Sequence, residues 1–91
     1  MAVITLTSDF GLKDHHLAVV KGAILSHSPQ AVIIDITHEL NAHDIQSASF
    51  ILKNAFQSFP KGSIHIISVN TEPSEEHVFC CIKFKDHFFI S

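Results

Sequence analysis

Three short runs of β-branched and apolar residues alternate with two longer helical patterns, and this order limits the possible folds more than any other feature. The runs lie at residues 2–7, 31–37 and 63–69, and the helical patterns lie between them at 12–28 and 44–59. The run "AVIIDIT" is almost continuously apolar, which is typical of a parallel strand covered on both faces. The β-α-β-α-β order therefore predicts a parallel sheet with right-handed crossovers, flanked by helices.

Both helical patterns carry apolar residues at spacings of three and four. In the first pattern these include Leu17, Val20 and Ile24, and the pattern ends at Ser28-Pro29. The second has a broader stripe, which Pro60-Lys61-Gly62 ends. The residues of that stripe are Ile45, Ala48, Leu52, Ala55, Phe56 and Phe59. We expect Asn41 or Asp44 to begin the second helix, because both residue types are favoured at helix N-caps.

The C-terminal part of the sequence predicts a β-hairpin. Residues 77–84 and 87–91 have strand character, and Lys85-Asp86 lies between them as the turn. The sequence stops inside this apolar stretch. We therefore expect residues 1–91 to be the N-terminal piece of a longer protein.

Composition excludes several classes of protein. The 91 residues suffice for one small domain, and at 46% hydrophobic they are too apolar for a disordered chain. A net charge of −3 without a Lys/Arg cluster argues against nucleic-acid binding. No apolar run approaches the roughly 18 residues that span a membrane, and no basic segment precedes the first apolar run as in a signal peptide. Adjacent Cys80 and Cys81 would point to opposite faces of a strand, so we expect neither a disulfide nor a zinc pair. A reduced, cytoplasmic setting is therefore expected.

Polar residues follow each predicted parallel strand, at residues 8–11, 37–39 and 70–73. Ligands of parallel α/β sheets bind beyond the carboxyl ends of the strands, so these segments mark the predicted site. The sequence has three glycines and neither a GxGxxG motif nor a P-loop, which excludes dinucleotide and triphosphate sites of those types.

Asp9 ends the first strand and would repel a phosphate. Its carboxylate could instead accept hydrogen bonds from a pair of sugar hydroxyls, attract a cation or hold a metal. The alternative is structural: Asp9 could cap the following helix, a position that Asp14 could fill equally well.

Eight histidines raise the possibility of a metal site. A metal-dependent hydrolase that uses Asp9, His38 and His43 is an alternative, because imidazole and carboxylate ligands suit zinc, manganese or iron. His38 and His43 lack a helical repeat such as HExxH, however, and His65 in mid-strand is expected to be a core residue. We therefore expect no metal. A side-chain nucleophile has little support, because no G-x-S-x-G motif is present.

Three stretches together resemble the S-adenosylmethionine hydroxide adenosyltransferases, the hydrolase relatives of fluorinase and chlorinase. The stretches are "ITLTSDFGLKD", "VVKGAILSHSPQAVIIDITHELNAHDIQSASFIL" and "FPKGSIHIISVN". The resemblance implies that residues 1–91 are the N-terminal α/β domain of a larger two-domain protein, a nucleoside-binding domain that is incomplete at its C-terminal end and is followed by a β-barrel domain. It also implies a homotrimer, with a site between one subunit's N-terminal domain and a neighbour's barrel. It implies S-adenosylmethionine as substrate, with no cofactor: water or hydroxide attacks the ribose 5′ carbon, methionine leaves and adenosine forms.

The same resemblance implies roles for individual residues. Asp9 stands where the family binds both ribose hydroxyls, beside Phe10, and His43 stands where the halogenases carry a tryptophan beside the substrate. Asn70 and Thr71 complete the implied substrate contacts.

The implied catalytic positions depart from the family pattern. Asn70 replaces the usual aspartate, and His77 stands roughly where an arginine belongs. Asparagine cannot act as a base but can orient water by hydrogen bonds, and a histidine is only partly charged at neutral pH. A non-catalytic or altered-specificity relative that binds S-adenosylmethionine or adenosine is therefore an alternative. The residues that would form a halide pocket lie outside this segment, so it does not decide between water and halide as the nucleophile.

Overall fold

The protein is seen in a computed structural model that describes residues 2–11, 15–41, 44–69 and 80–91. In chain order the elements are β1 (Val3–Ser8), α1 (His16–His27), β2 (Val32–Thr37), α2 (Ile45–Ala55), the short 3-10 helix η1 (Phe56–Ser58), β3 (Ile64–Ser68), β4 (Cys81–Phe84) and β5 (His87–Ile90). This order confirms the predicted β-α-β-α-β unit and the hairpin that follows it. No helix among the described residues is long and apolar enough to cross a membrane.

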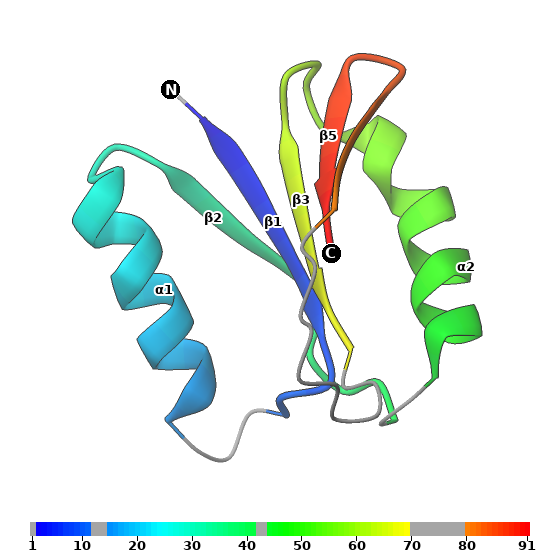
Figure 1. Ribbon diagram of the computed structural model, residues 1–91, viewed down its shortest axis with the longest axis horizontal. Coiled ribbons are helices and arrows are strands. Elements are labelled where there is room, and N and C mark those ends of the chain that lie inside the picture. The colour runs from blue at the N-terminus through cyan, green and yellow to red at the C-terminus, as the bar shows by residue number, and fades with distance from the viewer. Residues whose placement is uncertain (1, 12–14, 42–43, 70–79) are drawn as a thin grey trace.

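The five strands form one mixed sheet in the order β2-β1-β3-β5-β4, with the two helices on either side of it (Figure 1). β1 pairs in parallel with β2 and β3, and β5 pairs in parallel with β3. Among the described strands, only β4, at the edge, runs antiparallel to its neighbour. The hairpin therefore extends the parallel sheet instead of forming a separate one.

Strand register assigns the side chains to the two faces of the sheet. Thr5 of β1, His65 of β3 and Phe89 of β5 lie in one row across the sheet. The Phe56 ring, just after α2, meets the His65 and Phe89 rings edge to face, so this row faces α2. The next row consists of Leu6, Ile66 and Ile90 and faces α1.

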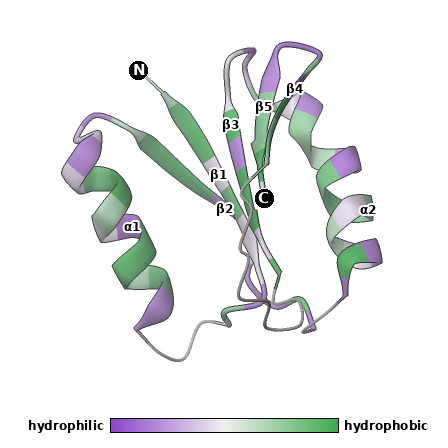
Figure 2. Cartoon of the chain, in the orientation of Figure 1, coloured by the Kyte–Doolittle hydropathy of each residue, from purple (hydrophilic) through white to green (hydrophobic). Residues whose placement is uncertain are grey.

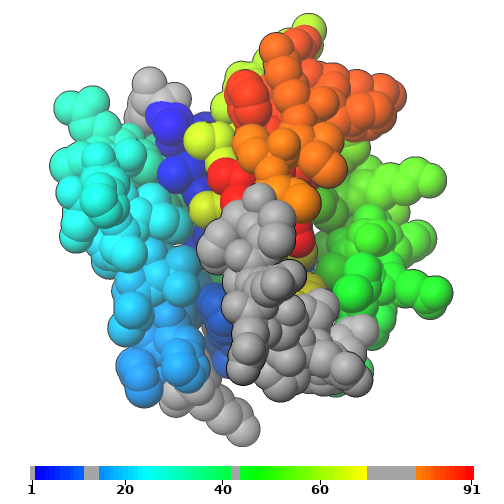
Figure 3. Space-filling model, in the orientation of Figure 1, coloured from blue at the N-terminus to red at the C-terminus, as the bar shows by residue number. Residues whose placement is uncertain are grey.

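The two helices contribute unequally to the core. Phe56 and Ala48 are buried on the α2 side, whereas no residue of α1 is buried. Apolar residues run along the strands and continue onto both helices (Figure 2). In the space-filling view, the side chains of α1 form one flank of the molecule, and those of α2 and the hairpin form the other (Figure 3).

The predicted hairpin turn is confirmed. Lys85 and Asp86 both adopt positive φ, 49° and 63°, as the two central residues of a type I′ turn require. The predicted start of the hairpin at residue 77 lies outside the described residues, and β4 itself begins at Cys81. Cys80 and Cys81 are free, exposed thiols.

Helix bounds differ modestly from the prediction. α1 begins at His16 instead of residue 12, and α2 gives way at Phe56 to a 3-10 turn instead of continuing to residue 59. Asp44, one of the two predicted caps, is the N-cap of α2. Its carboxylate accepts a hydrogen bond from the Ser47 amide at 3.1 Å. Hydrogen bonds from Ser47 lower the pKa of Asp44. The bond from the Ser47 backbone has the larger effect, and the bond from its hydroxyl adds to it.

His65 is a core histidine, as predicted, and is fully buried. Its Nδ1 lies 2.6 Å from Thr5 Oγ1, and its Nε2 lies 2.9 Å from His87 Nδ1. Burial lowers the pKa of His65 from its ordinary value of 6.5, and the neighbouring His87 lowers it further. Folding therefore favours the neutral imidazole.

This burial predicts an acid-sensitive fold. Below about pH 6.5 the unfolded chain binds a proton at His65 that the folded chain resists, so the free energy of unfolding should fall as the pH falls. Urea unfolding at pH 8 and pH 5.5 measures this difference. His65→Leu should reduce the pH dependence, whereas His27→Gln, on the exposed end of α1, should leave it unchanged. An unaltered pH dependence in His65→Leu would contradict the assignment.

Candidate functional site

The segment after β1 crosses the carboxyl edge of the sheet and touches the ends of both neighbouring strands. The Asp9 amide donates to the Ser68 carbonyl at the end of β3 at 3.3 Å, and the Gly11 amide donates to the His38 carbonyl after β2 at 2.6 Å. Two of the three predicted site segments thus meet at one edge. The third, at 70–73, lies outside the described residues.

Gly11 allows this crossing to be tight. Its φ is +74°, in the left-handed region where a side chain is disfavoured. In this conformation its amide donates to the His38 carbonyl. The glycine of the "SDFG" sequence therefore shapes the segment that carries Asp9.

A chain of polar side chains runs from this segment to α1. Ser8 Oγ lies 2.5 Å from His38 Nδ1, and His38 Nε2 lies 2.7 Å from Asp35 Oδ1. The second Asp35 oxygen accepts from Lys21 Nζ, also at 2.7 Å. We name these residues the edge chain: Ser8, His38, Asp35 and Lys21.

An irregularity in β2 helps to bring Asp35 and His38 together. The partner of β1 shifts from Asp35, opposite Leu6, to Thr37, opposite Thr7, so Ile36 is an extra residue in the pairing. Residues three apart on a regular strand face opposite sides of the sheet. The extra residue re-aims the end of the strand, as β-bulges do.

The direction of each hydrogen bond in the edge chain follows from the groups that it joins. Because Asp35 is ionised, we assign the ring proton of His38 to Nε2, which donates to it. Nδ1 is then an acceptor and receives the Ser8 hydroxyl. Ser8 Oγ in turn accepts the Phe10 amide at 3.3 Å. Every link from Lys21 to Phe10 thus has one donor and one acceptor.

Electrostatics favour the ionised form of Asp35. Burial raises the pKa of Asp35, but the hydrogen bonds from Lys21 and His38 and the charge of Lys21 outweigh it and hold the pKa below the ordinary 3.8. The Lys21 and Asp35 side chains are 34% and 38% exposed, so solvent screens this ion pair. The inner members, Ser8 and His38, are buried.

Ser8, His38 and Asp35 are hydrogen-bonded in the order of a serine-hydrolase triad, although no sequence motif indicates one. Ser8 is only 2% exposed. Its hydroxyl is engaged by the His38 ring and by the Phe10 amide. A serine held in this way serves to position the segment around it, and we assign it no nucleophilic role.

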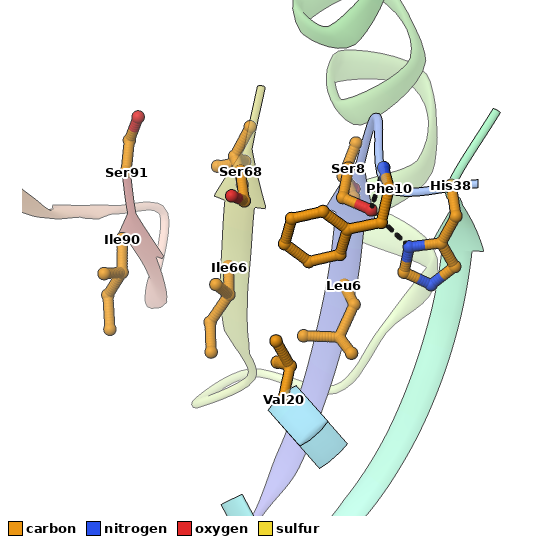
Figure 4. A pocket seen from close by; sticks show the side chains of 11 residues that line it. Leu6, Ser8, Phe10, Val20, His38, Ile66, Ser68, Ile90 and Ser91 are labelled. Atoms are coloured by element: carbon orange, nitrogen blue, oxygen red, sulfur yellow. Dashed lines mark hydrogen bonds between the residues drawn. The ribbon is translucent and has the colours of Figure 1, made fainter. Parts of the chain in front are cut away.

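A cavity of about 180 Å³ lies beneath the edge on the α1 face of the sheet. The Phe10 ring lies beside the Ser8–His38 pair at its upper end, with apolar strand residues below (Figure 4). Its lining residues are Leu6, Thr7, Ser8, Phe10, Val20, His38, Ile66, Ile67, Ser68, Ile90 and Ser91. Sites for small molecules typically measure about 300–1,000 Å³, so this cavity is at most part of one.

The structure decides some of the predicted roles. Asp9 is not the N-cap of α1, because that position is His15, which makes no side-chain capping bond. Asp9 and Phe10 lie at the predicted edge of the sheet. His43, Asn70, Thr71 and His77 lie outside the described residues.

Metal ligation gains no support from the part of the chain that the structure describes. It contains no group of three or more His, Cys, Asp or Glu residues arranged to hold a metal ion. Both ring nitrogens of His38 are engaged, one by Ser8 and one by Asp35.

Comparison with known proteins agrees with this architecture. The sequence model of the family described as SAM hydroxide adenosyltransferase N-terminal domain matches residues 4–91. The chain belongs to this family. Among relatives of this adenosyltransferase domain, an (R)-S-adenosyl-L-methionine hydrolase of Methanocaldococcus jannaschii is 30% identical over 97% of the chain. The hydrolase of the same name from Thermus thermophilus is 31% identical over 77% of it.

Halogenating enzymes and solved structures also resemble this adenosyltransferase domain. A fluorinase of Nocardia brasiliensis is 31% identical over 68% of the chain. A crystal structure of an uncharacterized conserved protein from Thermotoga maritima matches 96% of the chain with a TM-score of 0.87 and 31% identity. The chain spans only 35% of the Methanocaldococcus hydrolase, 28% of the Thermus hydrolase, 21% of the fluorinase and 34% of the Thermotoga chain.

The edge chain predicts a measurable coupling between α1 and β2. Lys21→Met should raise the pKa of Asp35, because the variant removes a hydrogen bond and a charge that lower it. Titration of the Asp35 carboxyl carbon by NMR measures the shift. Lys53→Met, on α2, is the matched control and should leave Asp35 unchanged. Equal titration of Asp35 in both variants would disprove the Lys21–Asp35 contact in solution.

Proposed function

We propose that this chain is the N-terminal, nucleoside-binding part of an enzyme that cleaves S-adenosylmethionine to adenosine and methionine. The observation that carries the proposal is the position of Asp9. It follows β1 directly at the carboxyl edge, and hydrogen bonds to Ser68 and His38 hold the segment around it. Membership in the adenosyltransferase family and relatives named as S-adenosylmethionine hydrolases support the same substrate.

The proposed substrate carries no phosphate, so the Asp9 carboxylate does not repel it. Asp9 accepts hydrogen bonds from the two ribose hydroxyls, and its negative charge also favours a substrate that carries a sulfonium cation. Phe10 supplies an apolar surface beside the sugar. Charge-assisted bonds of this kind contribute about 1.5–3 kcal/mol each.

The reaction is a displacement at the ribose 5′ carbon. A water oxygen forms the new bond to carbon while the carbon–sulfur bond breaks. The electron pair of the breaking bond stays on sulfur and neutralises the sulfonium of the departing methionine. The water loses one proton to solvent, so one adenosine, one methionine and one proton form. Alignment of the water with the leaving sulfur, and its removal from bulk solvent, account for most of the rate.

Four further residues have proposed roles that rest on the family resemblance. Asn70 orients the attacking water, and His77 supplies a partial positive charge beside it. Thr71 and His43 contact the substrate. All four lie outside the described residues.

The chain supplies only part of the proposed site. It spans about a third of the Methanocaldococcus hydrolase. We propose that the remaining contacts come from a further domain of a neighbouring subunit in a homotrimer, and that the enzyme needs no cofactor and works in the cytoplasm.

A second candidate function is binding without turnover. Asn70 stands where the hydrolases carry an aspartate, and asparagine cannot take a proton from water. On this reading the protein binds S-adenosylmethionine or adenosine and releases it unchanged.

Turnover separates the two functions. The natural polypeptide that carries residues 1–91 should convert S-adenosylmethionine to adenosine and methionine, followed by chromatography. Asp9→Ala should weaken nucleoside binding by about 2–3 kcal/mol, about 30- to 150-fold, through the lost hydroxyl contacts. Asp86→Ala, in the hairpin turn, is the matched control and should bind normally. Binding without adenosine formation would favour the second function, and unchanged affinity in Asp9→Ala would remove Asp9 from the site.

The isolated chain provides a second test. Residues 1–91 alone should form no adenosine, because the proposed site needs contacts from outside them. The assay is the same chromatography, with the natural polypeptide at equal concentration as the positive control. Turnover by residues 1–91 alone would contradict a site shared between subunits.

A further inference from the structure

His38 holds the segment after β1 at two points. Its carbonyl oxygen accepts the Gly11 amide at 2.6 Å. Its ring Nδ1 accepts the Ser8 hydroxyl, whose oxygen accepts the Phe10 amide. The residues on both sides of Asp9 are therefore tied, directly or through one hydroxyl, to the same histidine.

The ring of His38 is itself held in place. Nε2 donates to Asp35 Oδ1 at 2.7 Å, and Asp35 binds Lys21 of α1. The His38 residue is 3% exposed, so water has little access to the ring. A buried ring with both nitrogens engaged has one preferred orientation, and Nδ1 points at Ser8.

We propose that His38 is a positioning residue for the nucleoside site, acting through Ser8 to fix the backbone on which Asp9 is carried. This inference rests on the proposed function, in which the Asp9 carboxylate binds the ribose hydroxyls. Groups that bind a ligand must be held within about 0.5 Å of the productive geometry to be effective. The Ser8 end of the ring performs this task, and the Asp35 end orients the ring.

Two amide variants separate the two ends of the imidazole. Asparagine at position 38 places an acceptor oxygen near the position of Nδ1, so His38→Asn can keep the Ser8 bond. Glutamine places its amide near Nε2, so His38→Gln can keep the Asp35 bond and loses the Ser8 bond. Both variants remove the ring and introduce the same functional group, so each is the matched control of the other.

The experiment measures affinity for S-adenosylmethionine by calorimetry, using the natural polypeptide that carries residues 1–91. His38→Gln should bind about tenfold more weakly, the effect of about one lost hydrogen bond. His38→Asn should remain within about threefold of the parent protein on the same basis. The opposite order, or equal losses in the two variants, would overturn the proposal.

Ser8→Ala provides an independent arm, which also serves where a His38 variant fails to fold. It removes the hydroxyl and leaves the His38–Asp35 pair intact, and it should bind as weakly as His38→Gln. A double variant with Ser8→Ala and His38→Gln should bind S-adenosylmethionine no more weakly than either single variant, because both substitutions remove the same hydrogen bond. Additive losses would show that Ser8 and His38 act separately and would overturn the proposal.

Amide hydrogen exchange distinguishes failure of this inference from failure of the proposed function. In His38→Gln, the Phe10 amide should exchange faster than in His38→Asn, with melting temperatures recorded for both. This readout needs no ligand. If the parent protein binds no nucleoside, the proposed function fails, whatever the exchange rates. If nucleoside binds but Phe10 exchange is the same in both variants, the positioning role of His38 fails.

Discussion

The parallel pairing of β1 on both of its edges is the constraint on which the rest of the structure depends. Ile4 lies opposite Ile33 of β2 on one side and Ile64 of β3 on the other. With both edges paired and both faces covered, β1 becomes the most buried strand, and the residues at its end have little freedom. The carboxyl edge is therefore built on the most constrained part of the chain, which suits a site that needs fixed side chains.

Most of the fold could be predicted from the sequence, because each element carries a local signal. The β-branched runs marked the parallel strands, and the Lys85-Asp86 turn marked the hairpin. The helix ends were less predictable: α1 begins after His15, which makes no side-chain cap, so no residue signals the boundary. The insertion of β5 beside β3 also has no local signal, because it depends on which edge of the sheet is open.

The site was only partly predictable. The rule that parallel sheets bind ligands at their carboxyl ends placed Asp9 and Phe10 correctly at the edge. The edge chain could not be foreseen, because Ser8 and His38 are separated by 30 residues and meet only when β1 and β2 pair. The approach of Asp35 to His38 further depends on the extra residue in β2, and side-chain alternation alone would place the two on opposite faces.

The unequal packing of the two helices has a consequence for the motions of the molecule. α2 is anchored by a buried alanine and leads into the Phe56 ring cluster, whereas α1 buries no residue. The Lys21–Asp35 pair that tethers α1 is also partly open to solvent, so dissolved ions weaken it. Of the two helices, α1 should therefore open first, as expected for a helix that buries no residue. Because Asp35 also binds the His38 ring, ionic strength should affect the carboxyl edge of the sheet through the helix that is held most loosely.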